Sequence, residues 1–144
     1  MHQKNMKKTI GRQEIASFPQ FGFNHLEVKI DSGAYTSSIH CKLVEELEDN
    51  QVKIIFLDES YPQYDGTEHV VEYIRQVDVK SSNGQVEKRY VILSEIELLG
   101  DKYPIYLTVT SRDVMKFPVL LGRKFLSKKF VIDVMLKNQD LPKT

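Results

Sequence analysis

The segment from 69 to 110 restricts the fold of this chain more than any other part of the sequence. It reads HVVEYIRQVDVKSSNGQVEKRYVILSEIELLGDKYPIYLTVT, and apolar residues alternate with polar ones through most of it. Such alternation is typical of β-strands that turn one face toward a core. Asn83-Gly84 and Gly100-Asp101 interrupt the pattern, and both dipeptides favour hairpin turns. Asn83-Gly84 fits a type I′ turn, so we expect successive strands joined by hairpins.

Shorter strand patterns flank this segment on both sides. We expect strands in EIASFP, HLEVKID, VKIIFL and FVIDVML, which begin at residues 14, 25, 52 and 130. The stretch SIHCKLVEEL, from 38 to 47, is compatible with either a strand or a helix. A short helix is expected after Gly122. Many short strands, tight turns and little helix predict an all-β domain, either a small barrel or a sandwich.

The composition is that of a globular domain. The chain has 144 residues, 41% of them hydrophobic, which is enough for one domain with its own core. Twenty basic and 20 acidic residues balance, so no overall basic field favours nucleic acid. No apolar run approaches the roughly 18 residues that a membrane span needs. We expect a disordered tail over 1–9, the domain over 10–137 and a second tail over 138–144.

Cysteine usage bears on the compartment. Cys41 is the only cysteine, so the chain can form no internal disulfide. The basic N-terminus has no apolar segment behind it of the kind found in secretory signals. Both features favour a reducing environment, and we expect a cytoplasmic protein.

A carboxylate stands at the end of one predicted strand. In VKIDSGAYTSSIHC, from 28 to 41, Asp31 follows an alternating apolar run and precedes Ser32, Gly33 and Ala34. One interpretation is a strand that ends in an Asx-type turn, which is common. The other is a catalytic carboxylate presented by a tight loop. This stretch taken alone supports both.

A second unusual stretch is PVLLGR, from 118 to 123. An apolar strand ends at Gly122, and Arg123 begins the predicted helix. Taken alone, the pattern indicates an ordinary buried strand followed by a glycine turn. The basic run GRKFLSKK, from 122 to 129, is typical of the solvated face of a short helix.

Together, DSGA at 31–34 and VLLGR at 119–123 resemble the paired signature of retroviral-type aspartic peptidases. In those enzymes Asp-Thr/Ser-Gly-Ala follows an apolar strand, and two apolar residues with a glycine come later, before a short helix and a final strand. A closer resemblance covers nearly the whole chain from Thr9, including GRQEIASFP, VKSSNGQVEKRYVI and LTVTSRDVMKFPVLLGRKFL. It is to a family labelled ATP-dependent zinc protease, which is found fused to or associated with RimK-type ATP-grasp peptide ligases. The resemblance implies a retropepsin-like closed β-barrel with a short helix near the C-terminus.

The resemblance also implies roles for particular residues. Asp31 would be catalytic. Because the aspartic peptidase mechanism needs two carboxylates, a homodimer would supply one Asp31 from each chain. Ser32 would bond across the dimer, Gly33 would adopt backbone conformations closed to other residues, and Ala34 would let the two loops meet. A flap would have its tip at Ser82, Asn83 and Gly84. The strand behind the catalytic loop, with its arginine, would comprise Leu120, Leu121, Gly122 and Arg123.

Zinc and ATP are not expected in this chain, and no cofactor is predicted. The sequence has no phosphate-binding Gly-rich loop, no His-Glu-x-x-His and no Cys-x-x-Cys. The neighbouring His40 and Cys41 would point to opposite faces of a strand, whereas a zinc site needs three or four convergent ligands. The substrate would be an extended peptide or protein, with a functional link to an ATP-grasp peptide ligase. The alternatives are a catalytically inactive peptide-binding module associated with such a ligase and, third, a metal-dependent hydrolase.

Overall fold

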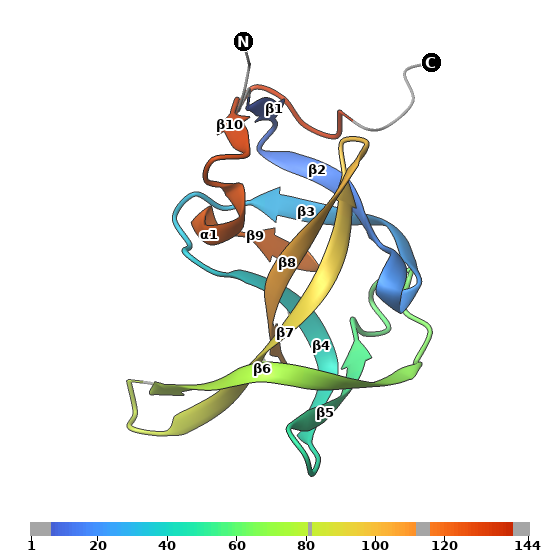
Figure 1. Ribbon diagram of the computed structural model, residues 1–144, viewed down its shortest axis with the longest axis vertical. Coiled ribbons are helices and arrows are strands. Elements are labelled where there is room, and N and C mark those ends of the chain that lie inside the picture. Colours follow the sequence, from blue (N-terminus) through green and yellow to red (C-terminus); the bar gives the residue numbers. More distant parts are fainter. Residues whose placement is uncertain (1–6, 81, 112–115, 140–144) are drawn as a thin grey trace.

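The computed structural model describes residues 7–80, 82–111 and 116–139, and their regular secondary structure is mostly β-strand (Figure 1). Two short helical segments are η1 (Pro19–Phe21) and α1 (Arg123–Leu126). The strands are β1 (Lys8–Ile10), β2 (Gln13–Phe18), β3 (Phe23–Ile30), β4 (Ser37–Glu46), β5 (Gln51–Phe56), β6 (Glu68–Lys80), β7 (Val86–Leu98), β8 (Asp101–Thr110), β9 (Val119–Leu121) and β10 (Phe130–Ile132). The predicted all-β class is confirmed.

The segment from 38 to 47, whose sequence is compatible with either a strand or a helix, forms most of strand β4. Ile39 and Cys41, two residues apart in β4, are both fully buried, as expected when alternate residues face a core. Between Cys41 and Leu43 the pairing with β5 shifts by one residue, which is a β-bulge. This shift displaces the side-chain alternation, so the apolar residues of the segment do not keep a strict two-residue period.

The strands form two sheets. In the smaller sheet, β1 pairs with β10 in parallel. The larger has the order β2-β3-β9-β4-β5-β6-β7-β8, with additional pairings of β2 with β7 and of β4 with β8. Through these pairings β2, β3, β9, β4, β8 and β7 form a continuous ring of hydrogen-bonded neighbours. We describe the architecture as an all-β fold whose sheet returns on itself, and not as a closed barrel.

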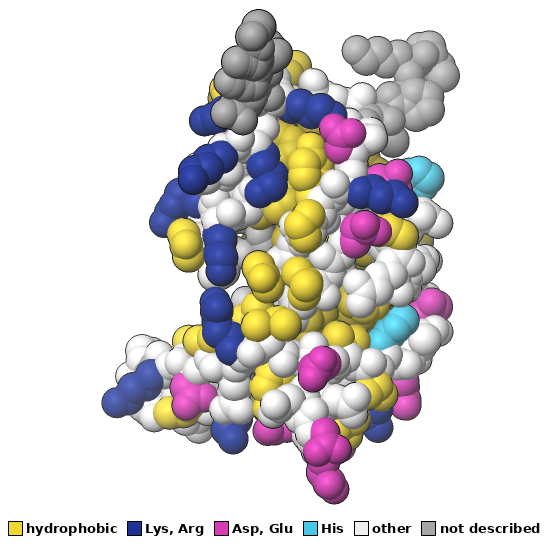
Figure 2. All heavy atoms as spheres, viewed as in Figure 1, with side chains coloured by type: hydrophobic (Ala, Val, Ile, Leu, Met, Phe, Trp, Pro, Cys, Tyr) yellow, Lys and Arg dark blue, Asp and Glu magenta, His cyan; other side chains and the backbone are white. Residues whose placement is uncertain are grey.

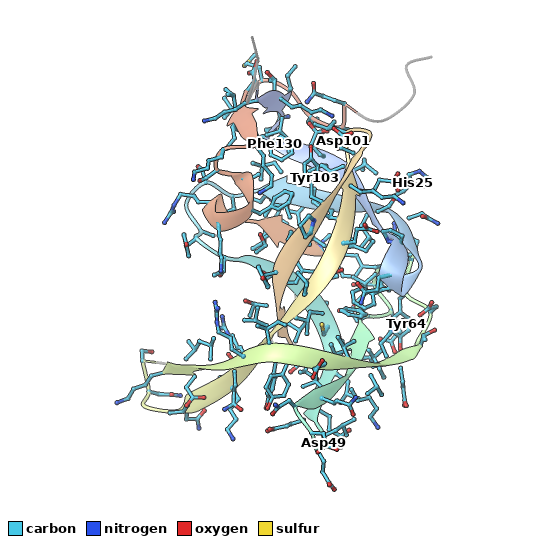
Figure 3. The ribbon with its side chains drawn as sticks, in the orientation of Figure 1. His25, Asp49, Tyr64, Asp101, Tyr103 and Phe130 are labelled. Carbon is cyan, nitrogen blue, oxygen red and sulfur yellow. The ribbon has the colours of Figure 1, made fainter. Side chains whose placement is uncertain are left out.

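The core lies inside this folded sheet, and aromatic residues fill two parts of it. The Phe21 and Phe56 rings lie 4.4 Å apart between centroids and pack near η1. At the end of the molecule that carries β1 and β10, Tyr103 and Phe130 lie close together (Figure 3), with 5.7 Å between their ring centroids. This second cluster fixes the small sheet to the β7–β8 hairpin.

Both hairpin turns differ from the prediction in detail. Lys80 and Val86 are the last paired residues of β6 and β7, so the connecting loop is longer than two residues. Gly84 has a φ of 87°, but Asn83 does not have a positive φ, so the type I′ prediction is wrong. Instead, the Asn83 side chain accepts a hydrogen bond of 3.1 Å from the Gln85 amide.

The second turn lies one residue earlier than expected. Leu98 pairs with Asp101, so Leu99 and Gly100 are the central residues, and their φ values are 52° and 87°. Two positive φ values in a two-residue loop are the mark of a type I′ turn.

The described parts of the expected tails are structured. Lys8 and Thr9, which the prediction placed in a disordered tail, belong to β1 and pair with β10. The Asn138 amide donates a hydrogen bond to the Gln13 carbonyl, so the segment after β10 runs along β2. Residues 1–6 and 140–144 of those tails lie outside the described residues. The predicted last strand is shorter than expected and ends at Ile132.

Candidate active site

The fold brings the two unusual stretches of the sequence together. β3 ends at Ile30, which is in register with Leu121 of the parallel strand β9. The Asp31 amide then donates a hydrogen bond of 2.9 Å to the Leu121 carbonyl. β9 also pairs with β4, so it lies between the strand that enters the Asp31 loop and the strand that leaves it.

The loop after β3 is a tight turn that holds the Asp31 carboxylate. The Ala34 amide donates to the Asp31 carbonyl at 3.1 Å, and the Gly33 amide donates to Asp31 Oδ1 at 3.0 Å. This is the Asx-type turn of the first interpretation, but it satisfies only one carboxylate oxygen. Within the described residues, Oδ2 makes no hydrogen bond, and Asp31 is partly exposed. The turn therefore fixes the carboxylate and leaves one oxygen available to another group.

The reason expected for glycine at position 33 is wrong. Its φ does not lie in the left-handed region, and a Cβ there would meet only Asp31 Oδ1, at 3.3 Å. The glycine therefore keeps the space beside the carboxylate clear.

Gly122 is required by a close approach of two backbones. A Cβ at this position would lie 2.5 Å from the Thr36 carbonyl oxygen, a separation that real structures do not show. The Gly122 amide also donates a hydrogen bond of 3.0 Å to the Ser37 hydroxyl, and Ser37 is buried. This role of Ser37 was not expected, because nothing in its spacing distinguishes it from its serine and threonine neighbours.

Arg123 has a partner that the sequence did not reveal. Its amide donates to the Ala34 carbonyl and that of Lys124 to the Tyr35 carbonyl, both at 2.9 Å. The Arg123 guanidinium donates from Nη1 to the Ser32 carbonyl at 3.0 Å and lies 5.7 Å from the centre of the Tyr35 ring. The start of α1 and its first side chain thus bind the loop after Asp31 at Ser32, Ala34 and Tyr35.

The residues that were expected to form a flap lie at the tip of the β6–β7 hairpin. Ser82, Asn83 and Gly84 are exposed there. In Figure 1 the hairpin tip and the loop between β3 and β4 lie toward the same edge of the molecule. No hydrogen bond joins them within the described residues.

A buried histidine and a partly exposed aspartate form a second polar cluster. His40 Nε2 lies 2.6 Å from Asp58 Oδ2, and the His40 side chain is almost fully buried. Hydrogen bonds from Ser60 lower the pKa of Asp58, and His40 lowers it further. The His40 amide donates to the Pro118 carbonyl, next to β9. From the sequence, His40 was weighed only as a metal ligand, because no spacing links it to Asp58.

Two findings concern metals and membranes. Within the ranges 7–80, 82–111 and 116–139, no three or more His, Cys, Asp or Glu side chains are grouped so that they could hold a metal ion. No helix in the same ranges has the length and apolar character needed to cross a bilayer.

Comparison with known families shows to which family the chain belongs. Residues 9–141 match a family model, RimB-like, described as "Retropepsin-like aspartic endopeptidase RimB". The chain belongs to the RimB-like family. This confirms the retropepsin-like part of the predicted resemblance. It gives no support to the zinc-protease label, and the association with RimK-type ligases remains a proposal.

Individual relatives of this RimB-like chain carry another name. It is 36% identical over 139 residues to "Probable alpha-L-glutamate ligase" of Shewanella halifaxensis, a match that covers 88% of this chain and 28% of the relative. It is 35% identical over 142 residues to the protein of the same name from Desulfotalea psychrophila, covering 95% of this chain and 30% of the relative. The chain thus spans less than a third of the length of these curated relatives.

A solved structure shares the fold of the RimB-like chain. The crystal structure of Lpg0085 from Legionella pneumophila, a protein of unknown function, superimposes with a TM-score of 0.73 at 23% identity. The match covers 94% of this chain and 100% of that one. At this identity the likeness concerns the fold alone.

Proposed function

We propose that this protein is a homodimeric aspartic peptidase that hydrolyses extended peptides with one Asp31 from each chain. The observation that carries the proposal is the Asp31 carboxylate, which is fixed by the Gly33 amide through one oxygen and has no hydrogen bond to the other within the described residues. Membership of a family described as aspartic endopeptidases supports it.

The reaction would use two carboxylates that share one proton. On the two-fold axis of a dimer, the like charges of two adjacent Asp31 side chains would keep one of them protonated. The ionised carboxylate would take a proton from water, whose oxygen then attacks the peptide carbonyl carbon. The protonated carboxyl would donate a hydrogen bond to the carbonyl oxygen. Transfer of a proton to the amide nitrogen would then break the C–N bond.

The residues around Asp31 would have supporting roles. Ser32 and Ala34 would lie where the two loops meet, with Ser32 bonding to its counterpart across the axis. Gly122 and Arg123 would hold the loop from behind, which is consistent with the close approach at Thr36 and the hydrogen bond to the Ser32 carbonyl. The β6–β7 hairpin would close over the peptide as a flap.

The relatives suggest a source for the substrate. Proteins named alpha-L-glutamate ligase contain a segment similar to this chain within a longer sequence. A functional link with an ATP-grasp ligase of that kind would make a glutamate-containing peptide the substrate. The second candidate function, an inactive peptide-binding module that serves such a ligase, rests on the same observation. The intact Asp31-Ser32-Gly33 sequence favours the enzyme.

Asp31→Asn tests the proposal directly. The amide keeps the shape of the carboxylate and accepts the Gly33 hydrogen bond, but it cannot act as a general base. Peptide hydrolysis should fall by several orders of magnitude, whereas thermal stability should stay equal or rise slightly because charge repulsion in the dimer is removed. The measurement is cleavage of a peptide library by both proteins at several pH values, with melting recorded in parallel.

Two outcomes would reject the enzyme. Equal hydrolysis by wild type and Asp31→Asn would show that Asp31 only closes a turn, since Asn serves in such turns about as well as Asp. Absence of hydrolysis in both proteins, together with tight peptide binding, would favour the binding module.

A further inference from the structure

Glu14 of β2 is a fully buried carboxylate that the proposed reaction does not use. Among the described residues it is the only acidic side chain in the interior, and it is 0% exposed. Its Oε2 accepts hydrogen bonds from the Gly11 amide at 2.8 Å and from Gln139 Nε2 at 2.7 Å. Its Oε1 accepts from the Gln139 amide at 2.8 Å. A carboxylate is costly to bury, and these hydrogen bonds offset the cost.

The partners of Glu14 are N–H groups from the two ends of the domain. In the part of the chain that the structure describes, no Lys, Arg or His side chain forms an ion pair with Glu14. Figure 2 shows basic side chains gathered instead on the surface, on the side where α1 lies. Both oxygens of Glu14 therefore serve as hydrogen-bond acceptors that join Gly11, before β2, to Gln139, after β10.

The segment that Glu14 holds, residues 133–139, packs against Gly11 and Arg12. We call residues 133–139 the C-terminal segment. The Arg12 amide donates to the Leu136 carbonyl at 2.9 Å, and Arg12 Nη1 donates to the Val134 carbonyl at 3.1 Å. A Cβ at Gly11 would lie 2.5 Å from the Leu136 carbonyl oxygen, so the two backbones are in direct contact there. The C-terminal segment therefore fixes the position of Arg12 from one side.

On its other side, Arg12 contacts the residue that precedes Asp31. The Ile30 amide donates a hydrogen bond of 3.0 Å to the Arg12 carbonyl, and the next amide, that of Asp31, donates to the Leu121 carbonyl at 2.9 Å. Successive amides of a strand point to opposite sides. The end of β3 is therefore held between β9 on one side and Arg12 on the other, directly before the loop that presents the Asp31 carboxylate.

We infer that Glu14 is a positioning residue for the proposed reaction. It anchors the C-terminal segment, the segment holds Arg12 against Ile30, and Ile30 sets where the Asp31 carboxylate lies. The inference rests on the proposed function for the role of Asp31. A pair of carboxylates that must share a proton is sensitive to small displacements, so loosening of this support should slow the chemical step. Glu14 is buried and would not touch the peptide, so peptide binding should change little.

Glu14→Gln in the full chain tests the inference by two measurements. The amide keeps the shape of the carboxylate but places an N–H group against the N–H of Gly11 or Gln139, so at least one hydrogen bond is lost. With the library peptide that wild type cleaves fastest, kcat per folded protein should fall about 10- to 100-fold while KM stays within about twofold. By NMR, the Ile30 and Asp31 amides should exchange their hydrogens at least about tenfold faster than in wild type.

Asp58→Asn is the matched control. It also replaces a hydrogen-bonded carboxylate with an amide, but its partners Ser60 and His40 lie outside the Glu14 contacts. It should leave kcat and the exchange at Ile30 within about twofold of wild type. Gln139→Ala is a milder second variant that removes only the side-chain hydrogen bonds, and it should change kcat and exchange in the same direction as Glu14→Gln, by less.

Gln139→Ala also decides the question if Glu14→Gln does not fold. The inference is overturned if the variant that folds keeps the kcat and the amide exchange of wild type. It is overturned equally if Asp58→Asn changes both quantities as much, because the effect would then follow from lost stability in general.

The outcome is separable from that of the proposed function, because amide exchange needs no activity. If wild type cleaves no peptide but Glu14→Gln speeds exchange at Ile30 and Asp31, the coupling from Glu14 to the loop stands and the peptidase fails. If wild type cleaves peptides and Glu14→Gln cleaves them as fast, the peptidase stands and the positioning role fails.

Discussion

At Gly122 the absence of a side chain lets two backbones touch. We predict that Gly122→Ala lowers the free energy of unfolding by about 1–3 kcal/mol, because its Cβ would press on the Thr36 carbonyl oxygen and both residues directly adjoin the paired strands β9 and β4. Gly33→Ala is the comparison. Its Cβ meets only the Asp31 carboxylate, so it should preserve stability to within about 1 kcal/mol and reduce hydrolysis instead.

Urea unfolding of the two variants checks this pair. A Gly122→Ala protein as stable as wild type would show that the loop can move away from β9. Contact with β9 would then not be what holds the Asp31 loop in place.

The lowered pKa of Asp58 predicts how the free energy of unfolding depends on pH. Hydrogen bonds from Ser60, and then the contact with His40, hold the pKa of Asp58 below its usual value. Since the folded-state pKa is the lower one, the ionised carboxylate stabilises the fold above the unfolded-state pKa of about 3.9, and this contribution is lost as the pH falls through the folded-state pKa. Wild type should therefore exceed Asp58→Asn in stability by about 1–3 kcal/mol near neutrality. The difference should shrink below about pH 4.

Chemical denaturation at a series of pH values measures this difference. Asp49, at the exposed turn between β4 and β5 (Figure 3), provides the control, and Asp49→Asn should leave the profile unchanged. A constant gap between wild type and Asp58→Asn down to pH 2 would contradict the assigned role of the Asp58 charge.

At the level of strands and turns, local sequence patterns predicted much of the structure. Alternation of apolar residues located β6, β7 and β8, because in those strands burial follows the local side-chain period. The pattern could not place β9 between β3 and β4, since that arrangement depends on contacts between distant residues. The partner of Arg123 was missed for the same reason. Ser32 lies 91 residues earlier in the sequence and meets Arg123 only because β9 lies beside β3.

The flap can be tested through two glycines in similar environments. Gly84 and Gly22 have φ values of 87° and 78°, and a Cβ at either position would meet nothing within 4 Å. Alanine at each should therefore cost a similar amount, about 1 kcal/mol, from backbone strain alone. Only Gly84→Ala should reduce peptide turnover, because only Gly84 lies at the tip of the β6–β7 hairpin. Equal turnover in the two variants would remove the flap assignment.

For the whole molecule, the proposed chemistry requires two chains. We expect sedimentation equilibrium at micromolar concentration to give about twice the monomer mass, because one chain contributes a single Asp31 loop. Addition of a peptide should strengthen the association if the substrate contacts both chains. A protein that remains monomeric with peptide bound would rule out a carboxylate pair built from two copies of Asp31.

The position of β9 also sets the order in which the site can form during synthesis. The chain leaves the ribosome from its N-terminus, so Asp31 and both strands beside it emerge long before Leu121. Until β9 enters between β3 and β4, the Asp31 amide lacks the Leu121 carbonyl and the loop lacks Arg123. The nascent chain therefore carries its key carboxylate in an unformed site, and the same late strand that completes the sheet also completes the loop.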